Sequence, residues 1–277
     1  MKKLCAVVLF GHNPLPNEWE RISLLQCAEL LSAHPLYFLY PEGMDTSVYQ
    51  ELAPDLILKP FNPLWFSSVR LYNRLKVSME LYKSFSDYEY FLTYELDAFV
   101  FKDEVEKWCE LGLDYIGAPW FEGQEHATED APIVGVGNSG FSLRKISSVR
   151  KVLRSFKRIP QTRRQDQTIQ MGPLKFKIPE EFLLRGRHHW NWNDWSGNED
   201  AYWSRTVPQN MPWFRIADAE QASRFSFEVN GPVLYERIGG LPFGCHKWWE
   251  YSPDFWRPHI ESFGHVWPEP CSENVSP

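Results

Sequence analysis

Short apolar runs alternate with helical segments over the first part of the chain, and this order limits the folds that it can adopt. Leu4–Phe10, Leu36–Tyr40 and Leu56–Phe61 are apolar and are each followed closely by Gly or Pro, as is typical of buried strands. Between them, Glu18–Ser32 has apolar residues at helical spacing, and Ser47–Leu52 is a shorter helical segment. This order predicts a βαβαβ opening with a parallel sheet and helices on its faces.

The rest of the chain continues the alternation. Val69–Phe85 is expected to form one helix, and it precedes Tyr88–Phe101, an apolar run in which Tyr90–Tyr94 has the composition of a central strand. Further helices are expected over Lys102–Leu111, Lys145–Phe156 and part of Lys157–Gln170, strands over Asp114–Trp120 and Phe225–Glu228, and a loop over Phe121–Asp130. No internal repeat or sharp change in composition divides the chain.

Length and composition exclude several classes of protein. With 277 residues, 43% of them hydrophobic, the chain can bury a sizeable core as one domain or as two lobes that share a cleft. The 29 basic and 36 acidic residues give a net charge of -7 without long runs of one sign, which argues against nucleic acid as a partner.

Cysteine usage and apolar segments predict a cytoplasmic location. The five cysteines are widely spaced and form no C-x-x-C pair, as expected of reduced thiols. The apolar run after Lys2 and Lys3 is short for a secretory signal and lacks a small-residue cleavage site. No other stretch approaches the length of a transmembrane helix, so any membrane contact would be peripheral.

Two carboxylates, Glu95 and Asp97, follow the predicted central strand. Because side chains alternate along an extended chain, Glu95 and Asp97 lie on the same side of it. At the carboxyl edge of a parallel sheet they would hold a hard divalent cation, which takes its other ligands from water and from the phosphates of a substrate such as a nucleotide diphosphate. Acid-x-acid pairs are common, however, and the pair alone is explained as well by an Asp97 that caps a turn and a solvated Glu95.

The run from Val134 to Arg144 is rich in glycine. Gly135, Gly137 and Gly140 permit positive φ angles and the close approach of a ligand. The run is neither a P-loop nor a G-x-G-x-x-G motif that opens a helix. By its spacing it fits a tight hairpin equally well.

The segment from His188 to Trp203 is dense in possible ligand groups. Asn198 is suited to cap a helix, which would place Glu199 and Asp200 in its first turn, facing a cleft. Further on, His246 lies among aromatic residues, and a lone histidine of this kind is more often a structural hydrogen-bonding residue than a ligand.

Taken together and in this order, several motifs resemble those of a bacterial glycosyltransferase-like family of unassigned function, related to the GT-A nucleotide-sugar transferases. The motifs are Tyr72–Leu75, Glu95–Phe101, Asp114–Trp120, Gly137–Arg144, Asn198–Asp200 and Gly244–His246. Each motif alone is weak, but the series is specific and spans most of the chain. The resemblance implies an α/β fold, a GT-A-like Rossmann-type α/β/α sandwich with a mainly parallel central sheet. It also implies one domain over residues 1–277, with a nucleotide-binding half over about 1–101 and an acceptor-side half over about 102–277.

The resemblance further implies a metal-dependent transfer of a sugar from a nucleotide-sugar, with UDP-sugars favoured, to a saccharide acceptor, in polysaccharide biosynthesis. Mn²⁺ or Mg²⁺ would be bound by Asp97 and His246. The first acid of the family's Asp-x-Asp motif is replaced here by Glu95, which we therefore expect to contact the ribose or to lie behind the metal ligands.

The resemblance assigns the catalytic base to the acidic pair, with Asp200 as the base and Glu199 beside it. Asp200 would take the proton from the attacking acceptor hydroxyl, which gives inversion at the anomeric carbon. The segment from Gly244 to Lys247 is also similar to that of some retaining transferases, so both stereochemical outcomes are compatible with the sequence. The expected substrate contacts are Asn73, Arg74, Glu95, Asn138, Ser139, Gly140 and Trp195. For Trp195, and for Trp190 and Trp192 near it, core packing explains the residue at least as well.

Two alternative functions fit the same motifs. The first is a catalytically inactive module that binds a carbohydrate or a nucleotide-sugar without turnover. The second is a metal-dependent hydrolase or phosphotransferase that uses Asp97 and His246 and releases phosphate without a sugar acceptor.

Overall fold

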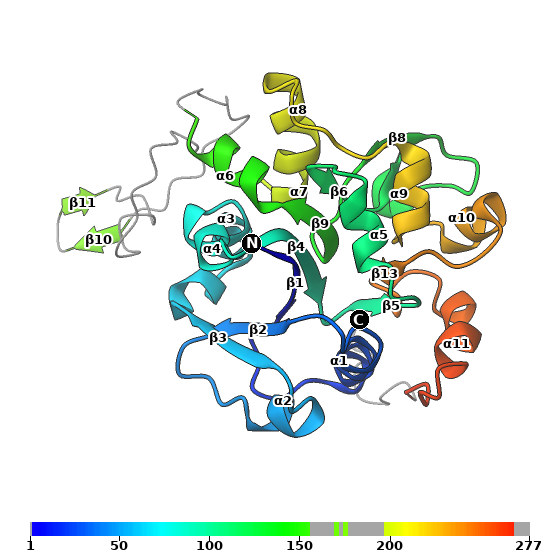
Figure 1. The fold of residues 1–277 in the computed structure, drawn as a ribbon, viewed down its shortest axis with the longest axis horizontal. Helices are drawn as coiled ribbons and strands as arrows, with labels where there is room; N and C mark the ends of the chain where they lie inside the picture. Colours follow the sequence, from blue (N-terminus) through cyan, green and yellow to red (C-terminus); the bar gives the residue numbers. More distant parts are fainter. Residues whose placement is uncertain (1, 156–168, 172–173, 177–196, 269–277) are drawn as a thin grey trace.

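The computed structural model describes residues 2–155, 169–171, 174–176 and 197–268, and a six-stranded sheet runs through its centre (Figure 1). In the order in which they pair, its strands are β3 (Ile57–Phe61), β2 (Leu36–Pro41), β1 (Lys3–Phe10), β4 (Tyr88–Glu95), β9 (Phe141–Lys145) and β6 (Tyr115–Ile116). The first four are parallel, and β9 is antiparallel to both of its neighbours. The prediction of an α/β fold with a mainly parallel central sheet is therefore confirmed.

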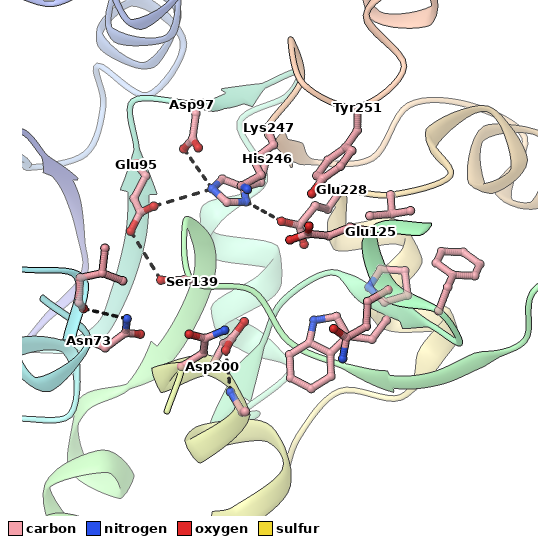
Figure 2. Close-up of a pocket in the computed structure, with 18 of the residues that line it drawn as sticks. Asn73, Glu95, Asp97, Glu125, Ser139, Asp200, Glu228, His246, Lys247 and Tyr251 are labelled. Atoms are coloured by element: carbon pink, nitrogen blue, oxygen red, sulfur yellow. Dashed lines mark hydrogen bonds and ion pairs between the residues drawn. The ribbon is translucent and has the colours of Figure 1, made fainter. Parts of the chain in front are cut away.

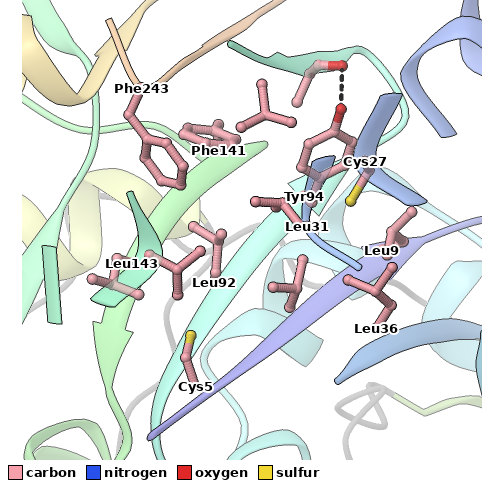
Figure 3. Close-up of a cluster of buried hydrophobic side chains, with 14 of the residues drawn as sticks. Cys5, Leu9, Cys27, Leu31, Leu36, Leu92, Tyr94, Phe141, Leu143 and Phe243 are labelled. Atoms are coloured by element: carbon pink, nitrogen blue, oxygen red, sulfur yellow. Dashed lines mark hydrogen bonds between the residues drawn. The ribbon is translucent and has the colours of Figure 1, made fainter. Parts of the chain in front are cut away.

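Helices cover both faces of this sheet, and the central strands are buried on both sides, as parallel strands usually are. On β1, Val7 and Leu9 face one core and Ala6 and Val8 face the other. The first core packs against α1 (Glu18–Leu30), α2 (Ser47–Leu52) and α5 (Val105–Glu110), and Figure 3 shows part of it. The second core packs against α3 (Val69–Lys76), α4 (Met79–Ser84), α6 (Ile146–Leu153) and α8 (Val207–Asn210).

The prediction of a single helix over Val69–Phe85 is wrong, because the structure has two helices there. Val77 leaves helical geometry with φ -113° and ψ 20°, and the Ser78 hydroxyl accepts a hydrogen bond from the Leu81 backbone N–H at 3.1 Å. Ser78 thereby caps a new helix, α4, with Glu80 in its first turn. The apolar periodicity continues across Ser78, so it does not reveal that this residue ends one helix and caps the next.

A smaller sheet brings the C-terminal part of the chain to the end of β4. Its strands are β12 (Ser226–Phe227), β13 (Gly244–His246) and β5 (Ala98–Val100), with β13 in the middle. Helices α9 (Ala219–Phe225), α10 (Gly231–Ile238) and α11 (Pro253–Glu261) lie in the same part of the chain, and a third, aromatic-rich core contains Phe99, Trp248 and Trp256. The sheet thus ties residues far apart in sequence to the turn after β4.

The glycine-rich run is not a hairpin. Its first part, β8 (Ile133–Val136), pairs with β7 (Pro119–Phe121), whereas its second part, β9, joins the central sheet. The loop expected over Phe121–Asp130 contains a short 3₁₀ turn, η2 (Gln124–His126). Outside these sheets the structure also has η1 (Pro63–Phe66), α7 (Glu199–Ala201), the π-helical turn η4 (Tyr202–Thr206), and the paired strands β10 (Ile169–Met171) and β11 (Leu174–Phe176).

Two expectations concern parts of the chain that are only partly described. Most of the predicted surface helix Lys157–Gln170, and Trp190, Trp192 and Trp195, lie outside the described residues. Among the helices that are described, none combines the length and the apolar character needed to cross a bilayer.

Candidate active site

Strand pairing brings Glu95, Asp97 and His246 together. Glu95 is the last residue of β4, and Asp97 lies in the turn between β4 and β5. The antiparallel register of β5 and β13 places His246 opposite Ala98, and the Lys247 N–H donates to the Asp97 carbonyl at 2.8 Å. The two acids that the sequence pattern singled out therefore meet a histidine from the other end of the chain.

The three side chains present their ligand atoms to a common point (Figure 2). The Nε2 atom of His246 lies 3.0 Å from Asp97 Oδ1 and 3.7 Å from Glu95 Oε2. Both Nε2 and Oδ1 are buried, and within the described residues neither has a hydrogen bond of good geometry. Adjacent ligands of an octahedral ion with bonds of 2.0–2.1 Å lie about 3 Å apart, so two carboxylates and one imidazole in this arrangement fit a divalent cation such as Mn²⁺ or Mg²⁺.

Glu95 is held by its other oxygen. Its Oε1 accepts a hydrogen bond from the Tyr72 hydroxyl at 2.9 Å and contacts the ammonium of Lys76, which is fully buried and also donates to Ser139 Oγ at 2.8 Å. Burial would raise the pKa of Glu95, but the Lys76 charge and the interaction with His246 outweigh it and lower this pKa well below its usual range. Glu95 is thus kept ionised with Oε2 turned to the metal-ligand cluster.

His246 is held in turn by Glu228, which follows β12 directly. The Nδ1 atom of His246 lies 2.9 Å from Glu228 Oε1, and Glu228 Oε2 accepts from the Asn138 side-chain amide at 2.9 Å. Burial would lower the pKa of His246, but Asp97, Glu228 and Glu95 together raise it well above its usual value. No role was predicted for Glu228 from the sequence, although an acid at the end of a strand is the same pattern that indicated a site at Glu95.

The segment Asn138–Gly140 supports the cluster from behind. The Asn138 carbonyl accepts from the Tyr115 hydroxyl at 2.8 Å, and its Oδ1 atom accepts from the Phe141 N–H at 2.6 Å. A Cβ atom on Gly140 would lie 2.0 Å from His246 Nε2, so this position has to be glycine for the imidazole to fit. Of the three residues predicted to contact substrate here, Ser139 lines a cavity, whereas buried Asn138 and Gly140 shape the site.

The acidic pair after Asn198 is divided between two environments. Asn198 occupies the N-cap position of α7, as predicted, and Glu199 is completely buried with its Oε1 2.8 Å from Arg144 Nη2. The Glu199 backbone N–H donates to Asn73 Oδ1 at 2.8 Å, which ties α7 to α3. Asp200 points instead into a cavity (Figure 2). Burial and the charge of Glu199 raise the pKa of Asp200 to about 7, the value that suits a general base at neutral pH.

Two cavities adjoin the metal-ligand cluster. The larger has a volume of about 370 Å³ and is lined by Asp97, Asp200 and His246 among others. The smaller has a volume of about 260 Å³ and extends to the carboxyl end of β1. Both are lined by Val69, Tyr72, Glu95 and Asp97, so the two acids form part of the wall between them. Asn73 lines the larger cavity, whereas Arg74 lines neither.

Fold and site thus define an α/β protein with a candidate cation site at the carboxyl end of β4 and a candidate base on α7 that lines the same cavity. The chain belongs to the family described as Protein of unknown function (DUF5672), whose model matches residues 55–246. Among curated proteins, none matches it.

The chain is also similar to solved structures of glycosyltransferases at low sequence identity. One is the galactosyltransferase LgtC in complex with donor and acceptor sugar analogs, with 13% identity, coverage of 95% of this chain and 98% of that one, and a TM-score of 0.48. A glycosyltransferase involved in glycosylation of the major capsid of PBCV-1 has 14% identity, coverage of 93% and 99%, and a TM-score of 0.46. Mouse xyloside xylosyltransferase 1 has 10% identity, coverage of 87% and 96%, and a TM-score of 0.45.

Proposed function

We propose that this chain is a metal-dependent glycosyltransferase that moves a sugar from a nucleotide-sugar to a saccharide acceptor. The observation that carries the proposal is the position of Glu95, Asp97 and His246 in and beside the wall shared by two cavities. A nucleotide-sugar could lie across this wall, with its diphosphate at the cluster. Its nucleoside would occupy the smaller cavity, and its sugar would extend into the larger cavity toward Asp200 and the acceptor.

The ligands of the cation would be Asp97 Oδ1 and His246 Nε2, as expected from the sequence, together with Glu95 Oε2. Glu95 would thus be a ligand itself, and not a ribose contact or a residue behind the ligands as the sequence had suggested. When bound, a divalent cation neutralises the charge that develops on the leaving diphosphate. Lys76 and Tyr72 keep the Glu95 carboxylate in place through its other oxygen, and Glu228 orients the His246 ring. These contacts supply the fixed geometry that a binding site for a small cation requires.

Asp200 would act as the general base. Its Oδ1 accepts a hydrogen bond from the Ala201 N–H at 2.7 Å, which leaves Oδ2 to receive the proton of the acceptor hydroxyl. As that proton leaves, the oxygen attacks the anomeric carbon and the bond to the diphosphate breaks, with inversion of configuration. Glu199, bound to Arg144, would position Asp200 without contacting substrate.

A thermal-shift experiment tests the proposal. The wild-type protein, Asp97→Ala and Asp87→Ala are each melted with UDP-, GDP-, CMP- and dTDP-sugars, with and without Mn²⁺. A ligand of the folded state raises Tm, so one donor class should stabilise the wild type and Asp87→Ala in a metal-dependent way, but not Asp97→Ala. Asp87 is the matched control because it is exposed at the opposite end of the same strand. No shift with any donor, or an unchanged shift in Asp97→Ala, would overturn the proposal.

A further inference from the structure

Arg205 lines the larger cavity beside an aromatic ring. The Cζ atom of Arg205 lies 4.6 Å from the centre of the Trp120 ring, and both residues border the cavity. Among the described residues no carboxylate forms an ion pair with Arg205, whereas Lys247, the other basic side chain of the lining besides His246, lies 3.1 Å from Glu250. Within the described part of the chain, the guanidinium is therefore available to bind an anionic group.

The Trp120 ring packs against two glycines, Gly135 in β8 and Gly137 directly after it. Trp120 pairs with Gly135 across the hairpin of β7 and β8. A Cβ atom on Gly137 would lie 2.2 Å from the ring, and one on Gly135 would lie 3.4 Å from the ring and 3.8 Å from Arg205 Nη2. The ring thus lies close against bare backbone, and Arg205 packs on a surface that is already formed. Less conformational freedom is then lost when the guanidinium binds a ligand.

The π-helical turn η4 helps to place Arg205 in the lining of the same cavity as Asp200. The Val207 N–H donates to the Tyr202 carbonyl, five residues earlier in the chain. In a regular α-helix, positions 200 and 205 would point about 140° apart. The wider turn brings residues five apart closer to one face, and both Asp200 and Arg205 line the cavity. Single π turns of this kind are frequently found at functional sites.

We infer that Arg205, supported by Trp120, binds an acidic group of the acceptor, so that the acceptor is a saccharide that carries a carboxylate or a phosphate. The planar guanidinium can donate two parallel hydrogen bonds to either group. At other positions in the cavity, an acidic group would be repelled by the carboxylates of the lining. These are Glu95, Asp97, Glu125, Asp200 and Glu228. Arg205 therefore sets the orientation, with the acid at Arg205 and a hydroxyl at Asp200. The inference rests on the proposed transferase function, because it concerns the acceptor side of that site.

Binding of three probes tests this inference by titration calorimetry: methyl glucoside, methyl glucuronide and glucose 6-phosphate. No metal is added, so that an acidic probe cannot bind through a cation. The wild type should bind at least one acidic probe roughly 10-fold more tightly than methyl glucoside, as expected for hydrogen bonds between charged groups. The acidic probe that binds shows whether the acid is a carboxylate or a phosphate.

Variants assign the preference to its residue. Arg205→Gln should abolish the preference for the acidic probe, and Arg205→Lys should retain part of it, because the charge remains but the planar fork is lost. Arg257→Gln, in an exposed pair on α11, is the matched control and should bind as the wild type does. The preference should also weaken as salt is added.

Three results would overturn the inference: equal binding of neutral and acidic probes, an acid preference that survives in Arg205→Gln, or no binding of any probe. The proposed function is tested separately through the dependence of metal and donor binding on Asp97. If metal and donor binding do not depend on Asp97, the proposed transferase function fails. The three probes then still show whether Arg205 binds acidic groups.

Discussion

Glu228 Oε1 lies 2.9 Å from His246 Nδ1, on the side of the ring opposite the Nε2 atom that faces Asp97 (Figure 2). A carboxylate in this position holds a proton on Nδ1, fixes the ring orientation and leaves the Nε2 lone pair for a cation. Asn138 orients Glu228 in turn. The candidate cation site therefore depends on a residue that contacts the histidine and not the ion.

The first prediction concerns Glu228→Gln. The amide cannot accept the Nδ1 proton as strongly, so Mn²⁺ affinity should fall roughly 10- to 100-fold, as is usual when the partner of a histidine ligand is removed. Mn²⁺ titration followed by electron paramagnetic resonance measures this directly, without any substrate. Glu220→Gln, in an exposed pair with Arg224 on α9, serves as the control and should bind Mn²⁺ as the wild type does. Equal affinity in Glu228→Gln would show that Glu228 does not support the ligand.

The second prediction concerns Gly140→Ala. The added methyl would lie 2.0 Å from His246 Nε2, so the imidazole has to leave the position in which Nε2 faces Asp97. Mn²⁺ affinity should fall by at least about 10-fold. The circular dichroism spectrum should keep its native shape, because the three atoms nearest the added methyl all belong to the His246 side chain and none to the backbone. Unchanged Mn²⁺ binding in a folded Gly140→Ala protein would contradict the observed position of the ring.

Much of the fold was predictable because buried parallel strands have a simple sequence pattern. The predicted strands Leu4–Phe10 and Leu36–Tyr40 differ from β1 and β2 by one residue at one end, and the predicted helix Ser47–Leu52 coincides with α2. Apolar periodicity depends only on neighbours in sequence, and so it could be interpreted without knowledge of tertiary contacts.

The site was less predictable because its geometry depends on long-range pairing. The Glu95-x-Asp97 pattern indicated a cation site, but the role of Glu228 depends on the placement of β12 beside β13. The fully buried Lys76 lies in a predicted helix, and only the tertiary fold brings its ammonium to Glu95. Which acid of the pair at positions 199 and 200 faces the cavity is decided by Arg144, from a distant strand.

The third prediction distinguishes the two neighbouring acids, Glu199 and Asp200. Glu199→Gln leaves the fully buried Arg144 without a counter-charge and should destabilise the protein by ~3–5 kcal/mol, the usual effect of breaking a buried ion pair. Asp200→Asn should not lower stability but should abolish transfer, because the amide cannot take a proton. Urea unfolding at pH 7 and a transfer assay compare the two variants. A stable Glu199→Gln protein, or an active Asp200→Asn protein, would contradict the assigned roles.

The fourth prediction follows from the raised pKa of Asp200, which is about 7 in the folded protein against about 3.9 in an unfolded chain. Between these values the folded state holds a proton that the unfolded state has lost, so this group makes the protein less stable as the pH rises from about 4 to about 7. Asp200→Asn removes the effect. Its stability relative to wild type should therefore increase from pH 5 to pH 8 in urea unfolding. Transfer by the wild type should change in the opposite sense and increase with an apparent pKa near 7, because the base acts only when ionised. If the stability of both proteins depends on pH in the same way, Asp200 is ionised throughout this range. Its deprotonation could not then control the rate of transfer.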